Sequence, residues 1–159
     1  MRILIVSDTH GRTNNLEWVL EKVKPLDLMI HLGDLEGGED YIEAIAPCPV
    51  QMVAGNNDYF SDLPRQKIID IGGYKALLVH GHHHGVSFDS RQVKEAARVE
   101  QCSIAMHGHT HWPSIDLKDG ITRLNPGSIS FPRQPDHRPT YILMEIDRFG
   151  TAHYTLNYV

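Results

Sequence analysis

Histidine occupies every second position in the stretch AMHGHTHWP, residues 105–113, at His107, His109 and His111. Imidazole is a common metal ligand, so this spacing is consistent with half of a metal site. An exposed strand would also place these side chains on one face without any chemical role. The stretch alone leaves both interpretations open until other segments are shown to supply further ligands.

Residues of the kinds that bind metals directly follow several other segments that have the composition of strands. The full set is Asp8, His10, Asp34, Asn56, His80, His109 and His111. Because the carboxyl ends of strands in an open α/β sheet form its ligand-binding edge, we expect these side chains to converge there. All are oxygen or nitrogen donors and none is a thiolate, which disfavours a structural zinc site of the cysteine type.

Seven donors are too many for one ion. They suit two ions about 3.5–4 Å apart that share a bridging carboxylate. Imidazoles mixed with carboxylate and amide oxygens favour first-row metals such as Mn, Fe, Zn or Ni, whereas calcium or magnesium would require mostly oxygens. Each motif taken singly is also ordinary turn chemistry. Their joint occurrence after several strands is what indicates a dinuclear metal site.

The elements that must position these residues alternate at first between strands and helices. Apolar runs predict strands at Ile3–Val6, Leu26–Leu32 and Val50–Ala54. Helical spacing of apolar residues predicts helices at Thr13–Lys24, with Thr13 as the N-cap, and at Glu39–Ala46. This β-α-β-α-β order favours a parallel sheet with right-handed crossovers.

The second half of the chain is richer in strands, with one further helix predicted at Ser90–Glu100. The predicted strands are Gln66–Ile71, Tyr74–His80, Ser103–His107, Ile115–Leu117, Ile121–Leu124, Tyr141–Ile146 and Thr151–Tyr158. A proline- and charge-rich surface loop is expected at Phe131–Pro139. The sequence therefore predicts a mixed α/β fold with two packed sheets, and we expect residues 1–159 to form one domain.

Composition and charge narrow the class of protein. The formal net charge of −5 argues against a strong nucleic-acid footprint. No apolar stretch approaches the roughly 20 residues of a membrane span, and the apolar run near the N-terminus is too short for a signal peptide. The cysteines, Cys48 and Cys102, lie far apart and form no metal or redox motif, so we expect a reducing, cytoplasmic environment.

The ligand motifs together resemble the calcineurin-like metallophosphoesterase superfamily. The matching segments are Asp8-Thr9-His10, Gly33-Asp34, Gly55-Asn56-Asn57-Asp58, His80-Gly81-His82 and Gly108-His109-Thr110-His111, in the family's order. The opening ILIVSDTHG and the later Asn125-Pro126-Gly127-Ser128 are similar to the small YfcE-type phosphodiesterases. The resemblance implies a four-layer α-β-β-α sandwich of two mixed sheets, with a dinuclear centre at the loop ends between them.

The resemblance also implies which residues hold each ion. Asp8, His10 and His111 would hold the first ion, Asn56, His80 and His109 the second, and Asp34 would bridge them. We expect two divalent ions per chain, manganese first, with iron, nickel or zinc as alternatives. Outside these motifs, His107 is interpreted as an ordinary strand residue, the alternative being a place beside the ligands. His31 is expected to be a buried histidine whose hydrogen bonds are satisfied.

One position departs from the superfamily's pattern. Many members have histidine in the third position of Gly-Asn-His-Asp, where it can protonate the leaving oxygen, and here that residue is Asn57. Asparagine donates a hydrogen bond but no proton at neutral pH. Since a general acid contributes typically about 10²–10⁴ in rate, we expect either good leaving groups or a substitute acid such as His82. Asp58 is expected to orient a ligand histidine.

These residues favour a metal-dependent phosphodiesterase acting on a small or nucleotide-like diester. Arg12, Asn125 and Ser128 are candidate substrate contacts, and backbone positioning is the alternative for the last two. The competing functions are a non-catalytic protein-interaction scaffold on the same fold, a phosphomonoesterase and a nuclease. An oligomer is compatible with the sequence, which leaves the physiological substrate and the native metal open.

Overall fold

The computed structural model describes residues 1–159, which build two mixed five-stranded sheets. The first sheet has the order β10-β9-β1-β2-β3, and the second has the order β4-β5-β6-β8-β7. The strands of the first sheet are β1 (Arg2–Val6), β2 (Leu28–His31), β3 (Val50–Met52), β9 (Thr140–Ile146) and β10 (Ala152–Tyr158). Those of the second are β4 (Gln66–Ile71), β5 (Tyr74–Val79), β6 (Ile104–Met106), β7 (Ser114–Asp116) and β8 (Thr122–Asn125).

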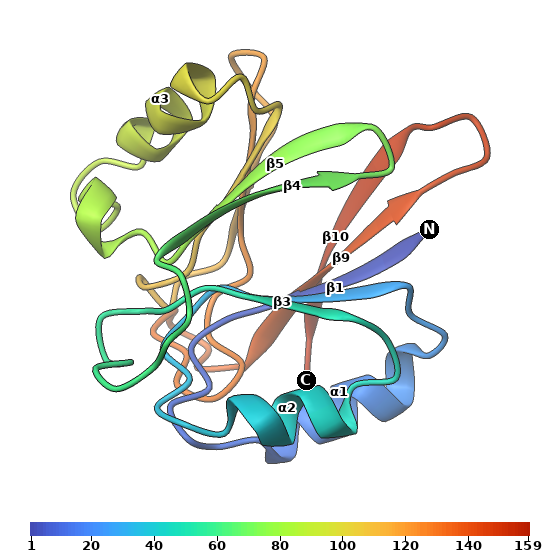
Figure 1. Ribbon diagram of the computed structural model, residues 1–159, viewed down its shortest axis with the longest axis vertical. Coiled ribbons are helices and arrows are strands. Elements are labelled where there is room, and N and C mark those ends of the chain that lie inside the picture. The colour runs from blue at the N-terminus through green and yellow to red at the C-terminus, as the bar shows by residue number, and fades with distance from the viewer.

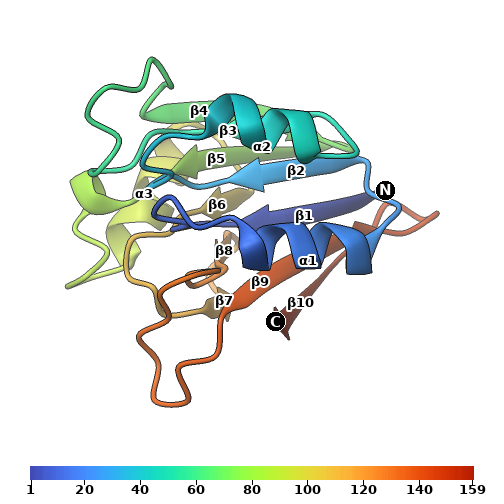
Figure 2. The ribbon, with the colours of Figure 1, turned by 90° about the horizontal axis from the view of Figure 1, so that it is seen from below.

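The helices cover the outer faces of the two sheets. Helices α1 (Asn14–Val23) and α2 (Glu39–Ile45) lie on the first sheet, and α3 (Arg91–Val99) lies on the second, with a 3₁₀ turn, η1 (His82–His84), before it. Figure 1 shows α1 and α2 below the stacked sheets and α3 on the opposite side, and Figure 2 shows the same layers from below. The expected four-layer sandwich is confirmed.

Strand β1 is apolar from Ile3 to Val6 because both of its faces are buried there. Ile3 and Ile5 belong to the core between the two sheets, whereas Leu4 and Val6 belong to the core beneath α1 and α2. Alternate side chains of a strand point to opposite faces, so a strand in a middle layer needs apolar residues at every position. The continuous run Ile3–Val6 is thus the sequence signature of the layered architecture.

The parallel pairings bring the ligand-bearing loops together. Strands β1, β2 and β3 are mutually parallel in the first sheet, and β5, β6 and β8 are parallel in the second. Each predicted element is present, with bounds that differ by a few residues. One detail differs: Thr13 stands at the N-cap of α1, but its hydroxyl donates to the Glu17 carboxylate instead of capping the backbone.

Two further observations complete the fold. No helix in the structure has both the length and the apolar character needed to cross a membrane. Both cysteines are free thiols, with Cys102 buried beneath α3 and Cys48 packed at the edge of the core under α2.

Candidate metal centre

The loops that follow the parallel strands hold the predicted ligands in an unusual backbone conformation. Five of them have positive φ angles, from 47° to 69°: Asp8, His10, Asp34, His109 and His111. The left-handed region costs a non-glycine residue about 1–3 kcal/mol and is found where the surrounding structure enforces it, often at functional sites. The chain thus bears backbone strain at the positions that the sequence singles out for metal binding.

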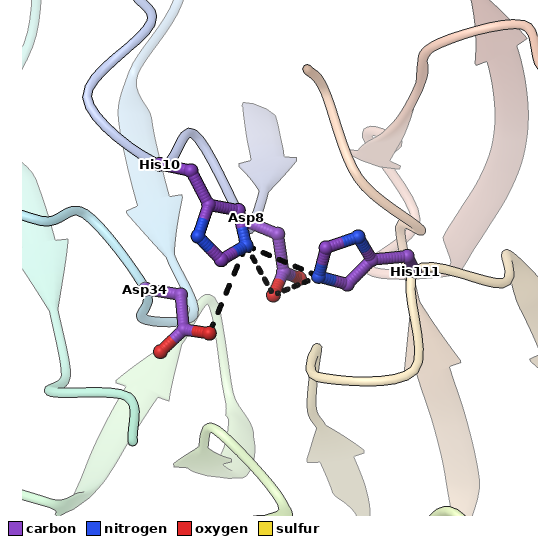
Figure 3. A group of neighbouring side chains, drawn as sticks. All are labelled: Asp8, His10, Asp34 and His111. Atoms are coloured by element: carbon purple, nitrogen blue, oxygen red, sulfur yellow. Dashed lines mark hydrogen bonds and ion pairs between the residues drawn. The ribbon is translucent and has the colours of Figure 1, made fainter. Parts of the chain in front are cut away.

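Four of these side chains form one compact group, drawn in Figure 3. One potential ligand atom from each of Asp8, His10, Asp34 and His111 lies within 4.8 Å of the others. His111 Nε2 lies 3.2 Å from Asp8 Oδ1, and His10 Nε2 lies 3.8 Å from Asp34 Oδ2. The two histidine Nε2 atoms face each other at 3.1 Å. The arrangement could hold one metal ion.

The predicted ligands of the second ion lie on the other side of Asp34. His80 Nε2 is 3.4 Å from Asp34 Oδ2 and 3.9 Å from Asp8 Oδ1. The ring of His109 lies 5.1 Å from that of His80, centroid to centroid. Asn56 precedes Asn57, whose backbone and side-chain N–H groups both bond to the Asp34 carboxylate. Asp34 Oδ2 therefore lies close to both His10 and His80, as an oxygen of a bridging ligand would.

Hydrogen bonds to the far nitrogen orient three of the histidine rings. His10 Nδ1 lies 2.6 Å from Glu36 Oε1, His111 Nδ1 lies 2.5 Å from the Phe131 carbonyl, and His80 Nδ1 lies 2.7 Å from the Leu32 carbonyl. Each of these partners accepts only, so Nδ1 is the donor and each neutral ring directs an Nε2 lone pair inward. No sequence signal marks Phe131 and Leu32 as partners, because they act through backbone oxygens.

The inward-facing atoms fit a cation. Two Nε2 lone pairs 3.1 Å apart repel each other unless a positive charge lies between them. Three buried ligand atoms, Asp8 Oδ1, Asn56 Oδ1 and His80 Nε2, also have no hydrogen-bond partner. Because unpartnered buried polar atoms are destabilising, such a cluster needs an explanation. Bound cations supply one, and the imidazole, carboxylate and amide donors suit borderline first-row metals.

The ionisation of the cluster agrees with this reading. Burial opposes ionisation of Asp8 and Asp34, but histidine neighbours outweigh it and lower the pKa of both carboxyls, His111 acting on Asp8 and His80 on Asp34. Burial also opposes the charge on His80, yet the Asp34 carboxylate, 3.4 Å away, and the charge of Asp8 raise its pKa. The carboxylates are therefore ionised at neutral pH, and their negative charge favours a positive charge within the cluster.

Buried polar side chains behind the ligands hold the loops in place. His31 accepts the Gly33 N–H at 3.2 Å and pairs with the Thr9 hydroxyl at 3.1 Å, so it links the loops after β1 and β2. Burial lowers its pKa to about 4, which keeps the ring neutral. The expectation that His31 is buried with its hydrogen bonds satisfied is confirmed.

Two residues of the Asn-Pro-Gly-Ser motif, Asn125 and Ser128, form hydrogen bonds to the loops that carry the ligands. The Ser128 hydroxyl donates to the Asp8 carbonyl at 2.7 Å and accepts the Phe131 N–H. Asn125 Nδ2 bonds to Thr110 Oγ1 at 2.8 Å, between two of the predicted ligands. Both side chains are at most 1% exposed. Their contacts support the alternative of loop positioning, and fully buried Ser128 is wrong as a substrate contact.

The expected role of Asp58 is wrong. Its two carboxylate oxygens accept the backbone N–H groups of Gly55 and Glu36, each at 2.7 Å, rather than orienting a histidine. The residue that does pair with a ligand histidine is Glu36, which the sequence analysis missed. Its only sequence signal was an acidic residue two positions beyond Asp34.

His82 and Arg12 border the centre from opposite sides. The ring of His82 lies 5.5 Å from His80, and burial together with His83 lowers its pKa to about 4. A ring that is neutral at pH 7 is a poor proton donor, which argues against His82 as the substitute acid. The Arg12 guanidinium lies 4.4 Å over the Phe131 ring and lines an open cavity of about 560 Å³ with His10 and His111.

The alternation of histidines that marks the sequence does not persist in the structure. Strand β6 ends at Met106, and the positive φ angles at His109 and His111 break the strand geometry. His107 directly follows β6 and continues its pairing, since its backbone N–H donates to the Leu124 carbonyl of β8 at 2.9 Å. It is 1% exposed, and its ring contacts the Gly108 carbonyl and Arg123 Nη1, each at 3.1 Å.

The two-sheet fold and its metal-type cluster together define a metallophosphoesterase-like protein. Residues 1–148 match the family model of the calcineurin-like phosphoesterase superfamily domain. A probable metallophosphoesterase of Bacillus subtilis, YsnB, is 33% identical over 136 residues, which cover 84% of this chain and 78% of that protein. The chain belongs to the calcineurin-like phosphoesterase superfamily.

Solved structures share the fold over nearly the whole chain. A predicted phosphoesterase of Streptococcus pneumoniae TIGR4 superposes with a TM-score of 0.80 at 28% identity, covering 99% of this chain and 97% of that one. Vps29 of Entamoeba histolytica complexed with Zn²⁺ gives 0.78 at 24% identity, with 99% of both chains covered. An archaeal phosphodiesterase gives 0.76 at 20% identity, covering 99% of this chain and 100% of that one.

Proposed function

We propose that this chain is a metal-dependent phosphodiesterase with two metal ions, acting on a small or nucleotide-like phosphodiester. The observation that carries the proposal is the convergence of the Nε2 atoms of His10, His80 and His111 on the Asp8 and Asp34 carboxylates. Family membership supports hydrolysis of a phosphoester bond. The archaeal phosphodiesterase of the same fold supports a phosphodiester as the bond that is cleaved.

The ligand assignment follows the two sides of Asp34. Asp8, His10 and His111 would hold one ion, Asn56, His80 and His109 the other, and Asp34 would bridge them. When bound, the ions would act as Lewis acids on the phosphoryl oxygens and activate a water molecule for in-line attack. Manganese is the metal we expect, with zinc, iron or nickel as alternatives that the same donors accept.

The chain's own groups bind the substrate and hold the bridging carboxylate. Arg12 lies on the rim of the open cavity, where its guanidinium can contact a phosphoryl oxygen. Asn57 Nδ2 donates to Asp34 Oδ2 at 2.8 Å, so this side chain fixes the bridging carboxylate. Because Asn57 holds no transferable proton at neutral pH, the reaction depends on a good leaving group.

The test is hydrolysis of bis-p-nitrophenyl phosphate by metal-stripped protein with and without added Mn²⁺, beside p-nitrophenyl phosphate. We expect Mn²⁺-dependent cleavage of the diester, weak cleavage of the monoester, and loss of activity in His109→Ala. His153→Ala is the matched control, since this exposed histidine pairs with Asp147 on the β9–β10 hairpin. Metal content measured on the same samples shows whether two ions bind per chain.

A scaffold function is the alternative. Vps29 shares the fold, and here Tyr59 and Phe60, beside the centre, are 78% and 103% exposed, as a protein-binding surface would be. The complete set of ligand types counts against it. If two ions bind and no diester is cleaved with Mn, Ni, Co or Zn, the phosphodiesterase proposal fails and the scaffold replaces it.

A further inference from the structure

A second polar cavity, of about 440 Å³, lies beside the metal centre. Its walls include His107, Ser114, Trp112 and two arginines, Arg123 and Arg133. Arg133 also lines the open cavity that contains His10 and His111. The two cavities therefore adjoin through one arginine, and a molecule bound at the centre can extend into the second.

Arg123, one of the two arginines in this cavity, makes no hydrogen bond to a carboxylate. Arg123 Nη1 contacts His107 Nε2 at 3.1 Å and Ser114 Oγ at 2.9 Å, while the buried Nε has no hydrogen-bond partner. Asp116, on the paired strand, is bound instead to Lys94 at 2.8 Å. Burial lowers the pKa of Arg123, and the charge of Asp116 on the paired strand offsets this only in part.

The rest of the lining is mostly polar. None of the residues around the cavity is acidic, although the chain as a whole carries a net charge of −5. The serine hydroxyls of Ser87, Ser90 and Ser114 stand with two arginines, a combination suited to a multidentate oxyanion. The half-exposed Trp112 indole forms part of the rim.

We propose that this cavity binds a phosphate group, and that this group is a second phosphate carried by the substrate whose diester lies at the metal centre. The substrate class is thus a phosphodiester that bears a further phosphoryl group, such as a nucleotide diester with a terminal phosphate. This inference rests on the proposed function for the diester and on Arg123 and Arg133 for the phosphate. Free inorganic phosphate is the other source of the same chemistry.

Binding is tested first, without catalysis. Inorganic phosphate is titrated into the full chain after chelation of metals, and binding is followed by calorimetry and by the fluorescence of Trp112. We expect Arg123→Gln to weaken binding about tenfold or more, because it removes a charged hydrogen-bond donor. Arg98→Gln, the same change on the exposed face of α3, is the control and should bind as the wild type does.

Arg133→Gln keeps the test decisive if Arg123→Gln does not fold, because Arg133 is an exposed residue outside any helix or strand. Circular dichroism establishes folding of each variant. No phosphate binding by the wild type at about 10 mM, or equal affinity in the wild type and both folded variants, overturns the phosphate site.

Catalysis by the metal-loaded enzyme then separates the two sources of phosphate. The substrates are thymidine 5′-(p-nitrophenyl phosphate) with and without a 3′-phosphate, which differ only in the second anionic group. In the wild type, we expect kcat/KM to be about tenfold higher for the substrate with the 3′-phosphate than for the one without it. In Arg123→Gln, we expect the two substrates to have nearly equal kcat/KM. If the wild type binds phosphate but has the same kcat/KM for both substrates, the substrate assignment is overturned and free phosphate is the ligand. If neither ester is cleaved, the proposed function fails, while the calorimetry still decides the phosphate site.

Discussion

Glu36 provides the sharpest test of the candidate metal centre, because it contacts a ligand without being one. Its Oε1 lies 2.6 Å from His10 Nδ1 and turns the opposite nitrogen of that ring towards Asp34 and His111. The carboxylate also makes the imidazole a stronger donor to a metal. Glu36→Gln preserves the size of the side chain and a carbonyl acceptor but removes the charge.

The expected loss can be scaled from the geometry. Removal of a group that supports a metal ligand typically lowers metal affinity by about 10–100-fold. The Glu36 side chain is 43% exposed, so solvent screens part of its interaction with His10. We therefore expect the lower end of that range, a loss of about tenfold, or about 1.4 kcal/mol of binding free energy.

The assay is a competition titration of Mn²⁺ against a chromogenic chelator at pH 7.5, with wild type and variant. Glu43→Gln, the same change on the exposed face of α2, is the control and should bind Mn²⁺ as the wild type does. Thermal unfolding without metal should give similar midpoints for all three proteins. A Glu36→Gln affinity within about twofold of wild type would refute the role of Glu36 as the orienting partner of His10.

Three further predictions follow from the same cluster. Gly108→Ala should lower the free energy of unfolding by about 1–3 kcal/mol in urea denaturation, because the new Cβ would overlap Ser7 Oγ and lie 2.8 Å from Asp8 Oδ2; an unchanged midpoint would contradict the steric argument. His31→Phe should lower the free energy of unfolding by about 1–3 kcal/mol and weaken Mn²⁺ binding, because it leaves the buried Gly33 N–H without a hydrogen-bond acceptor. Stability and Mn²⁺ affinity equal to those of the wild type would exclude a role for His31 in holding the loops. Mn²⁺ affinity should fall as the pH decreases from about 8 to 6, because a proton on His80, whose pKa is raised, competes with the metal while the Asp8 and Asp34 carboxyls stay ionised; titrations that are flat over this range would count against His80 as a ligand.

The sequence predicted the strands well because their signal is local. The run Ile3–Val6 reflects burial on both faces, and Gly72-Gly73 marks the turn between β4 and β5. Strand ends were less accurate where tertiary hydrogen bonds decide them. Ala54 was expected in the third strand, but its N–H bonds to the Pro64 carbonyl, and β3 ends at Met52.

The site was predictable in residue type and only partly in arrangement. Metal-binding residues at the ends of predicted strands identified the loops that converge. The carboxyl ends of parallel strands meet at one edge of a sheet, so this convergence can be predicted before any side-chain contact is known. The partners that orient the rings come from distant backbone, as with the Phe131 carbonyl, which lies in a segment expected to be only a surface loop. The contact between His107 and Arg123 likewise depends on the end of β6 and on its pairing with β8.

The strained backbone at the ligands is held in place by hydrogen bonds from residues behind the loops. Asp8, His10 and Asp34 hold positive φ angles while Ser128 and His31 bond to the backbone or side chains of the same loops. A chain free to relax would turn the Nε2 lone pairs and carboxylates apart, and the hydrogen bonds behind the loops prevent it. A ligand that binds only the folded state stabilises it in proportion to the logarithm of its concentration. Metal binding should therefore raise the unfolding temperature with each increment of Mn²⁺, and His31→Phe should reduce that rise more than the control His153→Ala, because preorganised donors are what the metal selects.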